Sequence, residues 1–226
     1  MNLQYNKEIG LKGIEELNNI TQGLLAEGKM LPIMEAFYTI QGEGFNAGMP
    51  SYFVRIGGCD VGCSWCDVKE SWNALLHPPI EVDGVISQVL QCNAKAVVVT
   101  GGEPSNYNLK YFTDKVREGG FKTYIETSGV ANLTGDWDWI CLSPKRNKKP
   151  LEEIYSKASE LKVIIQTVDD FEWAEINAAK VNDDCILYLQ PEWSQSEKMM
   201  QHIVDYALAN PKWKVSIQNH KYMHIP

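Results

Sequence analysis

The chain has 226 residues, 44% of them apolar and 22% charged, which suffices to bury one core within a single domain. With 21 basic and 29 acidic residues, its formal net charge of −8 argues against general electrostatic attraction to nucleic acid or an anionic membrane. No apolar run reaches the ~18 residues of a membrane span, and the first residues lack the charge order of a signal peptide. We expect a cytoplasmic protein that binds a small molecule or a protein partner, with no nucleic acid or membrane partner.

From about residue 50 onward, apolar β-rich runs alternate with segments of helical period, which predicts an α/β fold with a parallel sheet. The expected strands are residues 52–56, 96–100, 122–126, 139–142, 161–166, 186–190 and 214–217. Helices are expected where apolar residues recur at helical spacing, within 82–90, 109–116 and 199–208. Ser194 and Glu197 have the spacing of a capping box, which predicts where the last helix begins.

Seven such strands suggest a partial, incomplete parallel β/α barrel. No repeat, linker or low-complexity tract divides residues 34–226, so we predict one domain there and an N-terminal extension of unknown role over residues 1–33. The unusual residues cluster where the expected strands end. Since the loops after parallel strands gather on one face, we expect a ligand site at that face.

The loop after the first expected strand carries Cys59, Cys63 and Cys66 in the spacing C-x3-C-x2-C. Three thiolates on a four-iron cluster leave one iron open to a substrate or cofactor. A zinc site normally takes four protein ligands, and the nearest fourth is His77; unrelated core thiols are the third interpretation. The other three cysteines, Cys92, Cys141 and Cys185, are expected to be ordinary buried thiols.

This spacing, with the aromatic residue Trp65 before the last cysteine, resembles the signature of the radical S-adenosylmethionine enzymes. The resemblance implies that S-adenosylmethionine chelates the open iron and yields a 5′-deoxyadenosyl radical on reduction. The segment Gly-Gly-Glu-Pro at 101–104 resembles the family's second motif, which holds the methionine amino group.

Three further features lie outside the cysteine loop. Gln41 and Glu43 stand among glycines that let the backbone approach a ligand. Arg55 lies within an apolar strand, where its guanidinium needs an anion, either an internal carboxylate or a ligand. The last eight residues, 219–226, are too aromatic for a frayed end, so we expect them to dock on the body.

Together these features resemble the 7-carboxy-7-deazaguanine synthases over residues 35–226. The resemblance implies a lyase of queuosine and deazapurine biosynthesis, which contracts the ring of 6-carboxy-5,6,7,8-tetrahydropterin with loss of ammonia. It also implies a flavodoxin-like or ferredoxin-like electron donor and a homodimer.

The resemblance further implies which residues serve each ligand. Residues implied to contact the pterin are Ile40, Gln41, Gly42, Glu43, Arg55 (with the substrate carboxylate), Thr100, His220 and Pro226 (through its terminal carboxylate). Residues implied for S-adenosylmethionine are Trp65, Gly102, Glu103, Ser143, Pro144, Lys145, Gln190, Pro191, Glu192 and Trp193, with Glu126 in support.

The family's magnesium ion is expected at Asp67. The family commonly follows this aspartate with Thr or Ser, whose hydroxyl helps to bind the ion. Val68 stands there instead and offers no oxygen, so the sequence leaves the dependence on magnesium open, with Asp67 or Glu70 as substitutes for the missing ligand.

Two other functions remain open. A radical-generating activase would share the cysteine loop and the Gly-Gly-Glu-Pro turn but would act on a partner protein, and it would not need Arg55 or a docked tail. A zinc-stapled binding module would use the three cysteines and His77. Protein colour separates the last interpretation, because an iron-sulfur protein is brown and a zinc protein is colourless.

Overall fold

A computed structural model describes residues 19–226 of the chain. The helices are α2 (Asn19–Ala26), α3 (Val82–Gln91), α4 (Lys110–Glu118), α5 (Glu152–Tyr155), α6 (Asp170–Ala178), α7 (Ser196–Ala209) and α8 (Asn219–Met223). The strands are β1 (Met30–Leu31), β2 (Ile33–Ile40), β3 (Pro50–Ile56), β4 (Ile80–Glu81), β5 (Ala96–Gly101), β6 (Lys122–Thr127), β7 (Trp139–Leu142), β8 (Glu160–Ile165), β9 (Ile186–Pro191) and β10 (Trp213–Val215).

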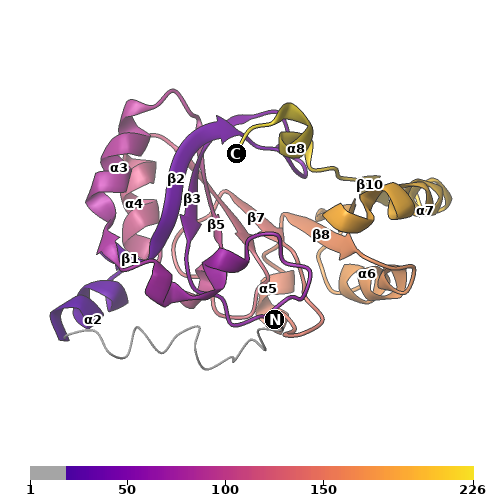
Figure 1. The fold of residues 1–226 in the computed structure, drawn as a ribbon, viewed down its shortest axis with the longest axis horizontal. Coiled ribbons are helices and arrows are strands. Elements are labelled where there is room, and N and C mark those ends of the chain that lie inside the picture. The colour runs from indigo at the N-terminus through magenta and orange to yellow at the C-terminus, as the bar shows by residue number, and fades with distance from the viewer. Residues whose placement is uncertain (1–18) are drawn as a thin grey trace.

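The main sheet has eight strands in the order β10-β9-β8-β7-β6-β5-β3-β2. From β3 to β10 every neighbouring pair is parallel, so all seven predicted strands and the partial barrel are confirmed. The eighth strand, β2, was not predicted and runs antiparallel to β3 at the edge of the sheet. Helices α3 and α4 cover one flank, and α6 and α7 lie beside the other (Figure 1).

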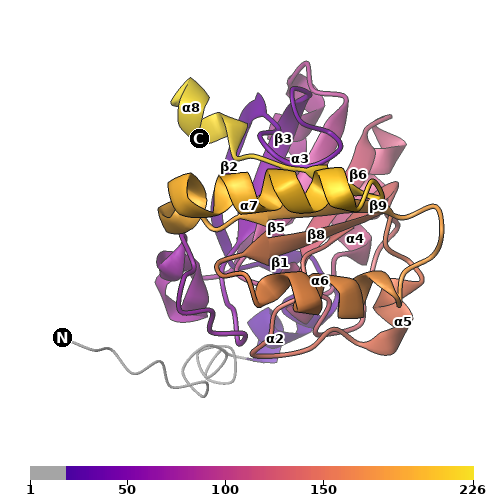
Figure 2. The same ribbon diagram turned by 90° about the vertical axis from the view of Figure 1, so that its right-hand side faces the viewer.

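The three helices predicted from apolar spacing are also confirmed. Each buries its apolar stripe against the sheet, through Val85 and Val89 in α3, Phe112 and Val116 in α4, and Ile203 in α7. Figure 2 shows α7 lying along the sheet beside β9. This packing is the expected outcome for amphipathic helices that connect parallel strands.

The predicted capping box at the start of α7 is wrong. The hydroxyl of Ser194 donates to Glu192 at 2.5 Å, and the Ser194 amide donates to the same carboxylate at 3.0 Å. A 3-10 turn over Trp193–Gln195 therefore precedes the helix, which begins at Ser196 with no side-chain cap. A carboxylate two residues upstream satisfies the hydroxyl before it can cap the helix.

Residues 19–33 of the expected extension pack onto the body, while residues 1–18 lie outside the described part. Leu31 is 1% exposed within the main core, and β1 pairs with β4. The carbonyl of Pro32 accepts the Gly57 amide at 2.7 Å, which fixes the start of the cysteine loop. Between residues 19 and 226, no helix is long and apolar enough to cross a membrane.

Candidate active site

A cavity of about 260 Å³ opens at the carboxyl ends of the parallel strands. Of the residues predicted for a site, those lining it are Ile40, Gln41, Gly42, Glu43, Arg55, Cys59, Cys63, Trp65, Cys66, Asp67, Thr100, Gly102, Glu103, Glu126, Ser143, Lys145, Gln190, Pro191, Glu192, Trp193, His220 and Pro226. Pro144 alone among them does not line it and is buried. The structure thus brings segments more than 180 residues apart, from Ile40 to Pro226, around one space.

The cysteine loop follows β3 and is held by backbone hydrogen bonds. The amide of Gly58 donates to Ser71 at 2.6 Å, and its carbonyl accepts the Glu103 amide at 2.9 Å. A Cβ at Gly102 would lie 2.5 Å from the Gly58 carbonyl oxygen, so only glycine lets the loop after β5 pass this close. The two motifs of the sequence therefore form one packed unit.

The three thiols of this loop line the cavity together. Among the described residues, however, no three His, Cys, Asp or Glu side chains are grouped as a site for a single metal ion. In a four-iron cluster each cysteine binds a different iron, so the thiols need not converge on one point as they do around zinc. Three cysteine thiols in the wall of one cavity fit a four-iron cluster that keeps one iron without a protein ligand.

His77, the fourth ligand considered for zinc, does not line the cavity. Its Nε2 lies 2.9 Å from the Glu70 carbonyl oxygen, and its ring fills the space where a Cβ of Gly57 would be. Burial raises the pKa of Cys59 to about 12 and also raises that of Cys63, so both are neutral thiols until a metal displaces the proton.

Glu103 of the Gly-Gly-Glu-Pro turn is 1% exposed, and its carboxylate is hydrogen-bonded to other residues of the protein. It accepts hydrogen bonds from the Thr127 hydroxyl at 2.5 Å and from the Ser128 amide at 2.8 Å, and from the Ser128 hydroxyl as well. This carboxylate ties the loop after β5 to the end of β6. Its contacts position the turn at the cavity wall.

Lys145 and Trp65 form the wall beside the cysteines. The Lys145 ammonium lies 5.3 Å from the centre of the Trp65 ring and donates to the Ser143 hydroxyl at 2.6 Å. Burial lowers the pKa of Lys145. A half-buried cation next to an aromatic ring and a hydroxyl suits a ligand that brings a carboxylate.

Strand register aligns Arg55, another lining residue, with Glu35 on β2 and with Thr100 on β5. The Arg55 Nε donates to Glu35 at 2.6 Å. The guanidinium is therefore paired with an internal carboxylate, which is one of the two anions expected from the sequence. Its terminal nitrogens bond to no other residue in the described part of the chain. The guanidinium therefore retains donors for an anionic ligand.

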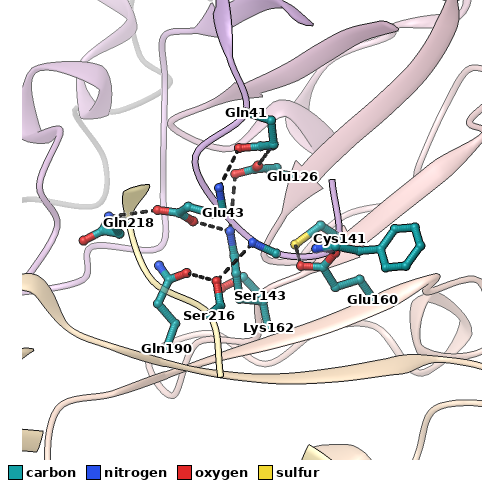
Figure 3. A network of polar contacts seen from close by, with 12 residues as sticks. Gln41, Glu43, Glu126, Cys141, Ser143, Glu160, Lys162, Gln190, Ser216 and Gln218 are labelled. Carbon is teal, nitrogen blue, oxygen red and sulfur yellow. Dashed lines mark hydrogen bonds and ion pairs between the residues drawn. The ribbon is translucent and has the colours of Figure 1, made fainter. Parts of the chain in front are cut away.

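Gln41 and Glu43 lie in a buried polar network (Figure 3). The Gln41 amide donates to Glu126 at 2.8 Å, and the Gln218 amide donates to Glu43 at 2.9 Å. Glu126, which is expected to support the cofactor, pairs with Gln41 and Lys162 at the cavity wall. The network fixes both carboxylates at the cavity wall.

Sequence reasoning missed Lys162, whose ammonium donates to Glu43 and lies 3.7 Å from Glu126. Burial alone would raise the pKa of Glu43, but the Lys162 charge and hydrogen bond lower it to about 2. A lysine within the apolar strand sequence ELKVII carries the same signal that identified Arg55. Other lining residues that received no role are Phe37, Phe53, Val61, Trp72, Thr127, Ser128, Ile164 and Gln218.

The C-terminal segment docks over the cavity, as predicted. The Asn219 amide donates to the Gly42 carbonyl at 3.0 Å, and the Trp193 and Tyr222 rings meet edge to face at 5.7 Å. Asp67, expected at a magnesium ion, lies 3.3 Å from the Lys221 ammonium. Figure 1 shows α8 and the C-terminus near the end of β2.

Three comparisons place the chain among known proteins. It is 56% identical over 200 residues to the 7-carboxy-7-deazaguanine synthase of Flavobacterium psychrophilum, covering 88% of this chain and 95% of the relative. The Synechocystis synthase is 44% identical, with 86% and 93% covered. The crystal structure of QueE from Escherichia coli superposes with a TM-score of 0.76 at 29% identity, covering 91% of this chain and all of that one. No protein-family model matches, but at these identities the chain belongs to the 7-carboxy-7-deazaguanine synthase family of enzymes.

Proposed function

We propose that the chain converts 6-carboxy-5,6,7,8-tetrahydropterin into 7-carboxy-7-deazaguanine with loss of ammonia, as a radical S-adenosylmethionine enzyme. The observation that carries this proposal is one cavity lined by two chemically different sets of residues. The cysteine loop and Lys145 form the first set, and Arg55, Gln41 and the docked tail form the second. A cofactor and a carboxylated heterocycle would then meet in the same space.

The first set of residues is suited to a four-iron cluster and S-adenosylmethionine. Cys59, Cys63 and Cys66 would bind the cluster, and Lys145 and Glu192 would hold polar groups of S-adenosylmethionine. When bound, these groups supply one-electron radical chemistry at the cavity. The chain itself contributes a buried setting, because β3, β5 and their glycine loops close the base of the site.

The second set of residues matches the donors and acceptors of a carboxylated pterin. The terminal nitrogens of Arg55 can pair with the substrate carboxylate as a fork. A 2-aminopyrimidinone edge presents adjacent N–H donors, which the carboxylate of Pro226 can accept, and Glu43 and Glu126 lie nearby. These groups orient the ring and exclude water from it.

Finer features follow the family resemblance. We infer a flavodoxin-like or ferredoxin-like electron donor, a homodimer and a magnesium ion near Asp67. At the magnesium site, Val68 offers no oxygen and the Lys221 ammonium lies 3.3 Å from Asp67, so the ion would compete with this lysine.

The decisive experiment is an anaerobic assay of the reconstituted chain with S-adenosylmethionine, a reductant and the carboxylated pterin. We expect 7-carboxy-7-deazaguanine by mass, together with ammonia and 5′-deoxyadenosine. Replacing Cys59, Cys63 or Cys66 with Ala should abolish both bound iron and product, whereas Cys92→Ala should preserve both. Formation of 5′-deoxyadenosine without a pterin product would favour an activase instead.

A further inference from the structure

Lys162 is a buried cation that the cofactor and substrate assignments leave without a role. It stands in β8 between the fully buried Leu161 and Val163, and its side chain is 5% exposed. An ammonium in such a place is costly unless it is paired. Its presence in the cavity wall therefore points to the groups that it pairs with.

Those groups are two carboxylates from separate parts of the chain. Glu43 follows β2 and accepts a hydrogen bond from Lys162, while Glu126 on β6 lies 3.7 Å from the same ammonium. Figure 3 shows the lysine side chain reaching from β8 towards both. One ammonium thus links two acidic residues that both line the cavity.

Each carboxylate has a second partner that holds its other oxygen. Gln218 donates to Oε1 of Glu43 at 2.9 Å, and Gln41 donates to Oε1 of Glu126 at 2.8 Å. Lys162 faces Oε2 of both. The orientation of the pair is therefore fixed from two sides, and only the lysine is shared.

Several charged or titratable groups surround the Lys162 ammonium, so its positive charge matters to all of them. Besides Glu43 and Glu126, the groups that interact with it are Glu160, Cys141 and Lys145. Burial raises the pKa of Glu160, which accepts hydrogen bonds from Trp139 and the Phe45 amide. Without Lys162, the Glu43 and Glu126 carboxylates would repel each other in a poorly solvated site.

We propose that Lys162 is a positioning residue for the substrate: it holds Glu43 and Glu126 as a fixed pair of acceptors for the N–H groups of the bound pterin. This inference rests on the proposed function. It assigns to Lys162 a larger effect on the affinity for the pterin than on the affinity for S-adenosylmethionine, because its direct partners are the two carboxylates.

The test uses the reconstituted protein and anaerobic calorimetry with the carboxylated pterin and, separately, with S-adenosylmethionine. Loss of interactions with a charged group predicts that Lys162→Met weakens pterin binding about 10- to 100-fold, with iron content unchanged and S-adenosylmethionine affinity changed much less. Lys162→Arg, which keeps the charge, should recover most of the affinity. Lys212→Met removes an exposed ion pair to Glu175 outside the cavity and serves as the matched control.

A double-mutant cycle separates positioning from a general structural role. If Lys162 acts through Glu43, adding Lys162→Met to Glu43→Gln should weaken pterin binding less than about threefold further, since coupled residues are not additive. That double variant also restores the balance of buried charge, so it decides the matter if Lys162→Met does not fold. A further loss of tenfold or more in this background would overturn the proposal.

Two other results would also overturn it: unchanged pterin affinity in Lys162→Met, or equal losses for the pterin and S-adenosylmethionine. The proposed function fails separately, on the unmodified chain. If that chain neither binds nor converts the carboxylated pterin, both proposals fall. If it does and Lys162→Met matches it, only the role of Lys162 is wrong.

Discussion

Gly42 and His220 adjoin so closely that a Cβ at residue 42 would lie 2.3 Å from Nδ1 of the His220 ring. The same glycine accepts the Asn219 amide through its carbonyl at 3.0 Å. The glycine-rich segment after β2 and the C-terminal helix are therefore built as one piece. This part of the cavity wall therefore depends on contacts between the segment after β2 and the C-terminal segment.

Gly42→Ala should displace the tail. Overpacking of this kind typically costs about 1–3 kcal/mol, and here the His220 ring must move away from the cavity. We expect weaker pterin binding with unchanged iron content, measured by anaerobic titration and iron analysis. Gly84→Ala in α3, where a Cβ meets nothing within 4 Å, is the control, and equal binding by both variants would disprove the coupling.

Arg55→Ala should weaken pterin binding by about 1.5–3 kcal/mol through the loss of a charged hydrogen bond. The cluster should remain, since Arg55 pairs with Glu35 and not with a residue of the cysteine loop. Dissociation constants for the carboxylated pterin measure the effect. As a control, Arg117→Ala removes an ion pair to Asp138 outside the cavity and should leave pterin binding unchanged. If Arg55→Ala also binds the pterin with unchanged affinity, Arg55 does not contact the substrate carboxylate.

Residues added after Pro226 should impair turnover, because Pro226 lines the cavity and its carboxylate is our proposed acceptor for the pterin edge. The same residues added before Met1 should have no effect. Turnover of the two tagged forms at saturating and limiting substrate is the measurement. Equal activities would show that the terminal carboxylate is not used.

The Glu43 ion pair predicts a stability change in acid. The folded pKa of about 2 lies below the ordinary 4.5, so its contribution is present above pH 4.5 and is lost as the pH falls towards 2. Between the unmodified chain and Glu43→Gln, both without metal, the difference in unfolding free energy should shrink by on the order of 3 kcal/mol over this range. Urea unfolding at several pH values measures it, and a constant difference would contradict the ion pair.

Val68→Thr should lower the magnesium concentration that saturates turnover. The threonine restores an oxygen at nearly the same volume, and magnesium favours oxygen ligands in octahedral geometry. Turnover against magnesium after chelator treatment compares the two proteins. Identical, tightly saturating curves would show that the site does not involve residue 68, and Asp67 or Glu70 would be examined next.

Local pattern predicted the parallel part of the fold and nearly all of the cavity lining. Apolar runs mark buried strands, and parallel strands place their following loops on one face, so the loops converge whatever their exact ends. The edge strand β2 was not predicted because Glu35–Ile40 was interpreted only as part of a ligand motif. The capping box failed because Glu192 competes for Ser194.

Contacts between residues that are far apart in the chain could not be predicted from the sequence. Glu43 meets Lys162 across 119 positions and Gln218 across 175, and no local spacing encodes such pairs. Lys162 itself carried a signal, since a lysine inside an apolar strand needs a partner. What the sequence lacked was the identity of that partner.

The most direct measurement is an anaerobic crystal structure of the reconstituted chain with S-adenosylmethionine and the carboxylated pterin bound. We predict that the substrate carboxylate lies within hydrogen-bond distance of the terminal nitrogens of Arg55, and that the pterin edge faces the Pro226 carboxylate. The sulfonium ligand should lie beside the cysteine loop in the same cavity. A pterin bound elsewhere, or one whose carboxylate faces away from Arg55, would contradict the assignment of the site.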